Sequence, residues 1–449
     1  MSSPRTSGIR VAIVSQPFDL VYPPDVDSSV PLQTVHLSRE LVSRGFQVVV
    51  YAPRKNAAVL HANVDGVAYR YLSERGSGFM NRLFAGIFKM LPWRRIPFHA
   101  SVLSELRYTV ELAIRIRAQK AKIIHVHSFT NFVPVIRIVN RRARFVLHMH
   151  SEWVCQMDAK IMGRRVAMTH LLVACSTHFA DVVRRAFPAS APRLRVLFNG
   201  VDTDFFSPAE QPAVSTNRSI RLLFVGRVSP EKGIHDLLEA FSQIASVLPE
   251  LELDIVGPDA SAPRGYIVDA SDDPTVRRLA EFYDVEERHG VSYLNQLKQR
   301  LSPALSARVR FCGPADRQRV LEHYRRADIL INPSLSEMFG GTVAEAMACG
   351  VPVVATRVGG MKDTVRHGET GLLVDPARPD ELAGAVRRLA TDPQLRRTMR
   401  QRARERAVAL VSWETLGAQL ATAYDGLIAA STPERSHEQR PAPTRAPHR

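Results

Sequence analysis

The sequence predicts an α/β protein built from two doubly wound, Rossmann-like domains. Its 449 residues exceed the size at which a single hydrophobic core stops growing, so two domains of roughly 200 residues each are expected. Short apolar segments alternate with helical patterns along both halves, which is typical of parallel sheets covered by helices. A polar stretch containing prolines, near residues 207–219, separates the two series and indicates a domain boundary.

The first half starts with a β-branched run over residues 9–14, which predicts a buried strand. A helical pattern over about 32–44 ends before Gly45 and leads into a strand over 47–51, so these segments form one strand, helix and strand unit. Further strands of the first domain are predicted at 122–127, 144–148, 171–175 and 195–198.

The second half repeats this pattern. Strands are predicted at 221–225, 251–256, 309–311, 329–332 and 351–355. Residues 258–299 are polar and look like an insertion in the second domain, and the sequence does not indicate its role. We therefore expect an N-terminal domain over 1–205, a C-terminal domain over 206–412, an amphipathic helix over 413–430 and a disordered tail, rich in proline and arginine, over 431–449.

Composition excludes some classes of protein. Hydrophobic residues make up 45% and charged residues 23%, which excludes wholesale disorder. The four cysteines, Cys155, Cys175, Cys312 and Cys349, form no C-x-x-C pair, so neither a zinc finger nor a disulfide framework is indicated. There is no run of 18 apolar residues and no apolar signal core in the first 30 residues, so we expect a cytoplasmic protein.

Positive charge is concentrated in the first half. Residues 1–200 contain 28 Lys and Arg against 11 Asp and Glu, whereas the remainder is nearly balanced. A basic surface attracts phosphate groups, so anionic lipid headgroups, a lipid-phosphate acceptor and nucleic acid are all possible partners. Arginine used only for solubility would explain the charge excess equally well. Residues 82–99 mix bulky apolar side chains with five cations, counting His99. They suit either a helix at an anionic membrane surface or an ordinary packed surface helix.

The first candidate binding loop follows the strand over 221–225. No G-x-G-x-x-G motif follows the first strand of the chain, which argues against a dinucleotide-dependent dehydrogenase. Instead, Gly226 begins a loop that ends at Gly233 and carries Arg227 and Lys232. Gly226 lets the backbone approach a ligand closely, and the two cations are suited to clamping a diphosphate. Many such loops carry cations, so this motif alone is weak.

A second candidate loop precedes the strand over 351–355. Phe339, Gly340, Gly341 and Thr342 open a helix whose free amides and dipole favour a phosphate. Two acids flank this tip. Glu345, more than a turn inside the helix, is placed to accept from two vicinal hydroxyls such as those of a ribose. Glu337, in the loop before the helix and at the opening of the expected binding site, is placed to accept hydrogen bonds from hydroxyls of a sugar. The alternative is that these acids only stabilise the N-terminus of the helix by interacting with its dipole, without binding a ligand.

The two loops together closely resemble those of the retaining glycosyltransferases of family 4, which have the GT-B fold. Supporting matches are 198–202, 358–360 and 368–374. The resemblance covers about residues 9–430, most strongly in the second half. It implies two Rossmann-like domains facing a cleft, a C-terminal helix that crosses back to the first domain, and an acceptor bound by the first domain.

The resemblance also implies roles for individual residues. Arg227 and Lys232 would bind the donor diphosphate, Glu345 the ribose and Glu337 the donor sugar. His150 looks like the counterpart of a histidine near the sugar, with a structural hydrogen bond as the alternative.

Other first-domain residues fit the resemblance less closely. His125, His127 and His148 are expected to be structural or on the acceptor side. The family commonly has Gly-Gly where this chain has Ser28 and Ser29, whose amides would meet the donor phosphate but whose side chains restrict a closer approach.

The expected activity is transfer without a metal or another cofactor, because no Asp-x-Asp motif stands in the catalytic context. Cations and the helix tip would stabilise the leaving diphosphate, whose oxygen would deprotonate the acceptor on the same face of the sugar. A UDP-sugar is the favoured donor, the acceptor is open and includes lipid-linked molecules, and no nucleic acid partner is expected. The alternatives are a GT-B relative that hydrolyses, phosphorolyses or epimerises a nucleotide sugar, and a non-catalytic basic binding protein.

Overall fold

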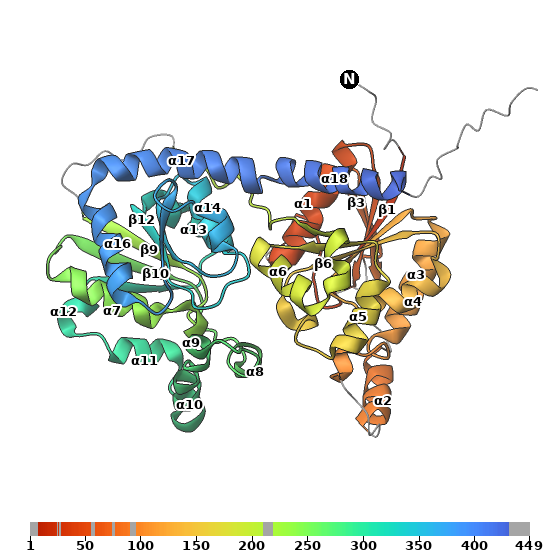
Figure 1. Ribbon diagram of the computed structural model, residues 1–449, viewed down its shortest axis with the longest axis horizontal. Coiled ribbons are helices and arrows are strands. Elements are labelled where there is room, and N and C mark those ends of the chain that lie inside the picture. The colour runs from red at the N-terminus through yellow and green to blue at the C-terminus, as the bar shows by residue number, and fades with distance from the viewer. Residues whose placement is uncertain are drawn as a thin grey trace, which may run out of the picture.

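The computed structural model describes residues 8–24, 26, 28–54, 59–73, 77–89, 96–209 and 219–430. The protein consists of two α/β domains joined along one side by two long consecutive helices (Figure 1). The predicted disordered tail over 431–449 and part of the predicted boundary, at 210–218, lie outside the described residues.

The first domain has an eight-stranded sheet in the order β3-β4-β2-β1-β5-β6-β7-β8. All of its neighbouring strands pair in parallel except β3 with β4. The strands are β1 Arg10–Val14, β2 Gln47–Pro53, β3 His61–Val64, β4 Val67–Leu72, β5 Ile123–His127, β6 Arg144–Met149, β7 Leu171–Ala174 and β8 Leu194–Val196. The main helices are α1 Ser29–Ser43, α2 Ser77–Lys89, α3 Leu106–Ala118, α4 Phe132–Val139, α5 Ala159–Ala167 and α6 Thr177–Ala186.

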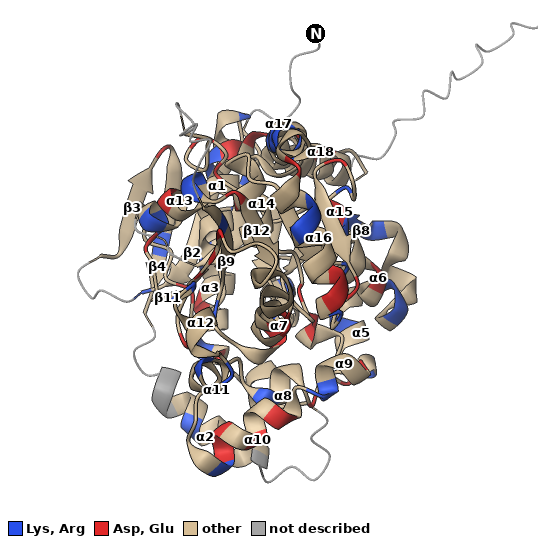
Figure 2. Cartoon of the chain, turned by 90° about the vertical axis from the view of Figure 1, so that its left-hand side faces the viewer, with Lys and Arg blue, Asp and Glu red and all other residues tan. Residues whose placement is uncertain are grey.

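The second domain has a six-stranded parallel sheet in the order β11-β10-β9-β12-β13-β14. Its strands are β9 Ile220–Val225, β10 Leu251–Val256, β11 Val309–Gly313, β12 Ile329–Asn332, β13 Val353–Thr356 and β14 Gly371–Val374. Its helices are α7 Ile234–Ala245, α8 Arg264–Ile267, α9 Pro274–Arg277, α10 Ala280–His289, α11 Tyr293–Gln299, α12 Pro303–Ser306, α13 Arg317–Arg326, α14 Gly341–Ala348, α15 Met361–Thr364, α16 Pro379–Thr391 and α17 Pro393–Val411. Seen from the side of this domain, charged residues lie mainly on helices and loops, while the sheet interior is mostly uncharged (Figure 2).

The predicted fold class is confirmed, and every predicted strand is present with its ends shifted by at most two residues. The sequence analysis missed β3, β4 and β14. The polar segment over 258–299 is not an excursion from the domain, because it forms α8 to α11 and contributes Phe282, Tyr293 and Leu297 to the hydrophobic core.

The C-terminal helix α18, Trp413–Ala429, crosses back to the first domain as expected. Leu416, Leu420 and Tyr424 are buried in the first-domain core. The two chain segments that pass between the domains run side by side, since the amide of Val201 donates to the carbonyl of Val411 at 2.9 Å. A further contact between the domains joins α6 to α15, where the amide of Thr177 donates to Oδ2 of Asp363 at 2.8 Å.

The helix predicted within 82–99 is α2, which ends at Lys89, and residues 90–95 lie outside the described ones. Phe88 is buried and its ring centroid lies 5.7 Å from that of Phe98, whereas Leu83 and Ile87 are about half exposed. The helix is therefore packed on one side and leaves apolar side chains at the surface on the other. Within the described ranges, no helix is both long and apolar enough to cross a membrane.

Candidate active site

The loop after β9 is shaped by close backbone packing. A Cβ on Gly257 would lie 1.9 Å from the carbonyl oxygen of Gly226, and one on Gly233 would lie 2.1 Å from the carbonyl oxygen of Pro333. Gly233 has φ 66°, in the left-handed region that favours glycine. These two approaches press the 226–233 loop against the end of β10 and against the loop after β12, so the two predicted binding loops are in contact.

Lys232 and Glu337 join the two loops. Nζ of Lys232 donates to Oε2 of Glu337 at 2.7 Å, and the two side chains are only 18% and 16% exposed. The carboxylate of Glu337 also accepts from the backbone amides of Gly340 and Phe339. Burial opposes ionisation of Glu337, but Lys232 and the two amides outweigh it, and its pKa lies below the ordinary value. Glu337 is therefore an anion held between a cation and a helix tip.

Helix α14 begins where the sequence predicts. Gly340 caps it with φ 86°, Gly341 is exposed, and Thr342 is half-buried in the first turn. Phe339 is buried, and its ring centroid lies 6.1 Å from that of Phe198 near the crossing from the first domain. The tip of α14 thus faces the first domain beside Glu337.

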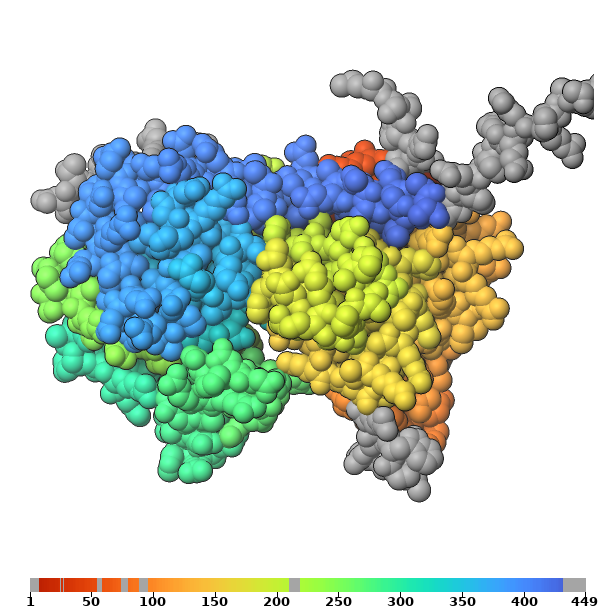
Figure 3. All heavy atoms as spheres, viewed as in Figure 1, coloured from red at the N-terminus to blue at the C-terminus, as the bar shows by residue number. Residues whose placement is uncertain are grey.

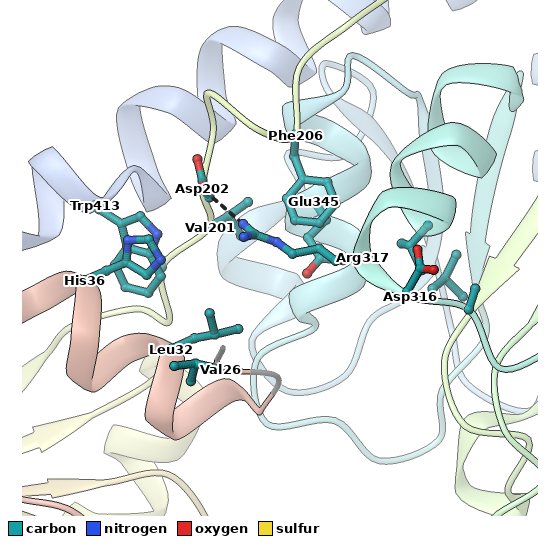
Figure 4. A pocket seen from close by; sticks show the side chains of 14 residues that line it. Val26, Leu32, His36, Val201, Asp202, Phe206, Asp316, Arg317, Glu345 and Trp413 are labelled. Atoms are coloured by element: carbon teal, nitrogen blue, oxygen red, sulfur yellow. Dashed lines mark hydrogen bonds and ion pairs between the residues drawn. The ribbon is translucent and has the colours of Figure 1, made fainter. Parts of the chain in front are cut away.

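Glu345 lines a cavity of about 480 Å³ between the domains (Figure 4). Tyr324 donates its hydroxyl to Oε2 of Glu345 at 2.8 Å. Burial raises the pKa of Glu345 to about 7, with Tyr324 and Arg317 opposing the rise. Arg317 reaches across the cavity to Asp202, with 3.0 Å between Nη2 and Oδ2, as Figure 4 shows.

The first domain closes the other side of this cavity. Val26, Leu32 and His36 line it, and the ring of His36 stacks on that of Trp413 with centroids 4.7 Å apart. The cavity therefore combines apolar side chains with the carboxyl groups of Asp202, Asp316 and Glu345 and the guanidinium of Arg317. Such a mixture suits a nucleoside.

Arg227 pairs with an acid of its own loop. Its Nη2 is 3.1 Å from Oε1 of Glu231, and it lines a second cavity of about 530 Å³ together with Ser336 and Met338 of the loop before α14. Arg227 and Lys232 therefore have different partners, although both border the Glu337 loop. The second cavity is otherwise lined by Tyr266 and Ile267 of the second domain and by first-domain residues, namely Gln16, Phe18, His99, Ser128, Phe129, Ser151, Glu152, Trp153, Gln156 and Met157.

His150 follows β6 and contacts His127, with 2.8 Å between Nε2 of His150 and Nδ1 of His127. Burial lowers the pKa of His150 to about 4, so the ring is neutral at physiological pH.

Ser28 and Ser29 are exposed at the start of α1, and Ser28 makes no side-chain cap. Neither lines the cavities described above, whose walls on this side are formed by Val26 and Leu32.

Sequence reasoning missed several residues that position the site. Glu231 is buried and accepts hydrogen bonds from Arg227 and from the hydroxyl of Ser229. Its position inside the 226–233 motif could have identified it as a site residue. Tyr324 and Arg317 come from α13, which carries no recognisable motif, so only the fold reveals their contacts with Glu345 and Asp202.

The two domains face each other across a gap below the connecting helices (Figure 3), and cavities lined by both domains lie between them. Lys232 and the tip of α14 meet at Glu337. This arrangement is typical of glycosyltransferases of the GT-B class. Residues 209–406 match the family model of glycosyl transferases group 1, and residues 32–205 match that of glycosyltransferase family 4. The chain belongs to the family 4 glycosyltransferases with the GT-B fold and is a nucleotide-sugar glycosyltransferase.

Similar proteins span nearly the whole chain. A glycogen synthase of Mycobacterium tuberculosis is 26% identical over 93% of this chain and 95% of its own length. A D-inositol 3-phosphate glycosyltransferase of Kribbella flavida is 28% identical over 87% of this chain and 88% of its own. Among solved structures, Anabaena HepE in complex with UDP superposes with a TM-score of 0.65 at 19% identity, covering 93% of this chain and all of that chain, which shows a shared fold.

Proposed function

We propose that the protein transfers a sugar from a nucleoside-diphosphate sugar, preferably a UDP-sugar, to an acceptor hydroxyl with retention of anomeric configuration and without a metal ion. The observation that carries the proposal is the contact of Lys232 with Glu337 at the tip of α14. The neighbours of Glu337, Ser336 and Met338, line the cavity that holds Arg227, and α14 contributes Glu345 to the other cavity. Each cavity is lined by both domains. A nucleoside in the first cavity and an acceptor in the second would meet at this contact.

The chemistry follows from the charges at the contact. As the bond between sugar and diphosphate breaks, negative charge grows on the phosphate oxygens, and Lys232, Arg227 and the amides of α14 would stabilise it. Glu337 would accept from hydroxyls of the sugar, and neutral His150 would lie near that sugar. The leaving phosphate oxygen would take the proton of the acceptor hydroxyl as the new bond forms on the same face.

The direct test is a screen of nucleoside-diphosphate sugars by thermal shift, since a true donor binds only the folded protein and raises its melting temperature. The stabilising donor is then incubated with candidate acceptors in the presence of a chelator, and the anomeric configuration of the product is read by NMR. An inverted product, or activity that the chelator abolishes, would contradict the proposal. Free sugar, sugar phosphate or an epimer formed without acceptor would favour the alternative of a hydrolase, phosphorylase or epimerase.

Donor binding should depend on pH through Glu345. Its raised pKa, about 7, means that the folded protein holds a proton on Glu345 at pH 6 and loses it by pH 8. A carboxylate accepts more strongly from ribose hydroxyls than a carboxylic acid does, so affinity should rise about tenfold from pH 6 to pH 8. Calorimetry with UDP-glucose at the two pH values measures this, because its diphosphate does not titrate in the range.

The variant Glu345→Gln should bind UDP-glucose more weakly and lose the dependence on pH, while Glu322→Gln, an exposed change on α13, should keep it. A tenfold change that persists in Glu345→Gln would assign the titration to another group.

We further propose a cytoplasmic location with peripheral contact between α2 and an anionic membrane, which would suit a lipid-linked acceptor. Its support is the pair Leu83 and Ile87, exposed beside Arg82 on a chain whose first 200 residues are strongly basic. Sedimentation with phosphatidylglycerol vesicles should be reduced severalfold by the double change of Leu83 and Ile87 to serine. The same change of Val247 and Val408, exposed in the second domain, is the control, and equal loss in both would contradict the assignment.

A further inference from the structure

Four histidines form a cluster inside the first domain, and one of them, His150, is the residue proposed to lie near the donor sugar. His127 of β5 is the register partner of His148 on the neighbouring strand β6. Because side chains alternate along a strand, His125 and His127 share one sheet face with His148 and His150. This face packs against α1 and α18. Centroids of contacting rings in the cluster lie 4.3 to 5.3 Å apart.

Three of the four rings are almost completely buried. His125 and His127 are 1% exposed and His148 is 0% exposed. Burial keeps the pKa of each well below its ordinary value, so each ring is neutral and offers a lone pair on one nitrogen. Each of the three residues has a ring nitrogen within 4.8 Å of those of the other two.

The hydrogen bonds of the cluster are incomplete. Nδ1 of His125 pairs with the hydroxyl of Tyr424 at 2.6 Å, but among the described residues its Nε2 has no hydrogen-bond partner. Both nitrogens of His148 also lack a partner within the described part of the chain. A buried polar group left unpaired typically costs about 1 to 3 kcal/mol, and the two rings that carry these three nitrogens have centroids 5.3 Å apart. The cluster therefore points to a ligand that accepts lone pairs from several imidazoles at once.

We propose that His125, His127 and His148 form a binding site for a first-row transition-metal ion, with zinc as the representative. Imidazole nitrogens are the ligands that zinc, copper, nickel and cobalt favour, whereas calcium and magnesium require oxygen ligands, which these three side chains do not provide. Zinc binds an imidazole nitrogen at about 2.1 Å, so the three nitrogens, which lie within 4.8 Å of one another, would have to move closer together around a central ion. Three protein ligands leave a fourth position for water or hydroxide, and hydroxide would lower the net charge inside the core.

The groups behind the ligands fit this assignment. A metal-binding histidine usually donates its second N–H to an oxygen or another acceptor, which fixes the ring. Tyr424 is placed to accept from Nδ1 of His125, and His150 to accept at Nε2 from Nδ1 of His127. The latter pair leaves Nε2 of His127 for the ion.

Metal binding would then change the tautomer of two rings. The hydroxyl of Thr34 donates to the carbonyl of Val30 at 2.9 Å, so toward Nε2 of His127, at 3.3 Å, it acts as acceptor, and without metal the proton of His127 is on Nε2. An ion on Nε2 moves this proton to Nδ1, which donates to His150. His150 must then carry its own proton on Nδ1.

The test uses the full untagged chain after treatment with EDTA and dialysis. Calorimetric titration with zinc chloride should show one equivalent bound, and a saturating excess should raise the melting temperature by about 3 °C. Cobalt chloride should give the visible absorption bands of a four-coordinate ion, and magnesium chloride should give no binding. Nitrogen NMR of the imidazoles should report the tautomer change of His127 and His150. Failure to bind one equivalent of zinc or cobalt would overturn the proposal, whether or not the protein transfers sugar.

Variants separate this site from adventitious binding. His148→Gln should lose the bound equivalent, and Tyr424→Phe, a milder change, should weaken zinc binding by about tenfold or more. His61→Ala, which removes an exposed histidine on β3 of the same domain, should bind as the wild type does. Unchanged zinc binding in the folded Tyr424→Phe protein, or loss of the equivalent in His61→Ala, would exclude the cluster as the site.

Discussion

Replacing Lys232 with alanine is expected to lower kcat/KM for sugar transfer by about 10³-fold or more while leaving the protein folded. The amine contacts Glu337 at 2.7 Å beside the tip of α14, where the diphosphate would gain charge in the transition state. Its loss removes that stabilisation and leaves the carboxylate of Glu337 without its cation. Initial rates with a saturating donor, together with a circular dichroism melt, measure the two effects separately.

The matched control is Lys362→Ala, which removes an exposed lysine of the same domain and should leave the rate unchanged. Glu337→Ala should cause a loss similar to that of Lys232→Ala, because the two residues act as one contact. Retention of more than a tenth of the wild-type rate in Lys232→Ala would show that this amine does not stabilise the leaving group.

Replacing Gly359 with alanine is expected to destabilise the second domain by about 2 to 4 kcal/mol and to reduce transfer by at least about 100-fold. Gly359 has φ 48°, and a Cβ there would lie 1.5 Å from the carbonyl oxygen of Glu337. The backbone of one loop must therefore move, and Glu337 moves with it. Urea unfolding gives the loss of stability, and rates at a temperature where the variant is folded give the loss of activity.

Gly368→Ala separates the two causes of this effect. Gly368 also has positive φ, at 80°, but a Cβ there would meet no atom within 4 Å. It should cost only the backbone strain, about 1 kcal/mol, and leave the rate intact. Equal losses in the two variants would mean that the contact with Glu337 has no special role.

The sequence predicted those parts of the fold whose signal is local. The core strands, such as β7 and β13, are short, mostly apolar runs whose residues are all buried, and these runs identified them. β4 contains Arg70 among aromatic residues, and β3 is an exposed antiparallel edge strand, so neither shows a continuous apolar run. The segment over 258–299 appeared to lie outside the core because its few apolar residues, including Phe282 and Tyr293, are spread over several short helices.

In the site, the motif placed the right residues in the right loops but did not determine their partners. Lys232 and Glu337 are 105 positions apart in sequence, and their contact depends on how Gly233 packs under Pro333. Arg227 turns to Glu231 because that acid lies one helical turn further along the same loop. The histidine cluster depends on the pairing of β5 with β6, which spacing along the chain does not reveal.

The chain crosses between the domains at two adjacent places, where the amide of Val201 donates to the carbonyl of Val411, and we expect any rotation of the domains to use this line as its axis. The cavity that holds Glu345 includes Val201 and Trp413 and so lies at this axis, whereas the cavity that holds Arg227 includes neither. A small rotation of the domains would leave the nucleoside end almost unchanged and widen the acceptor end most. We therefore expect a donor to bind the open enzyme before the acceptor pocket takes its final shape.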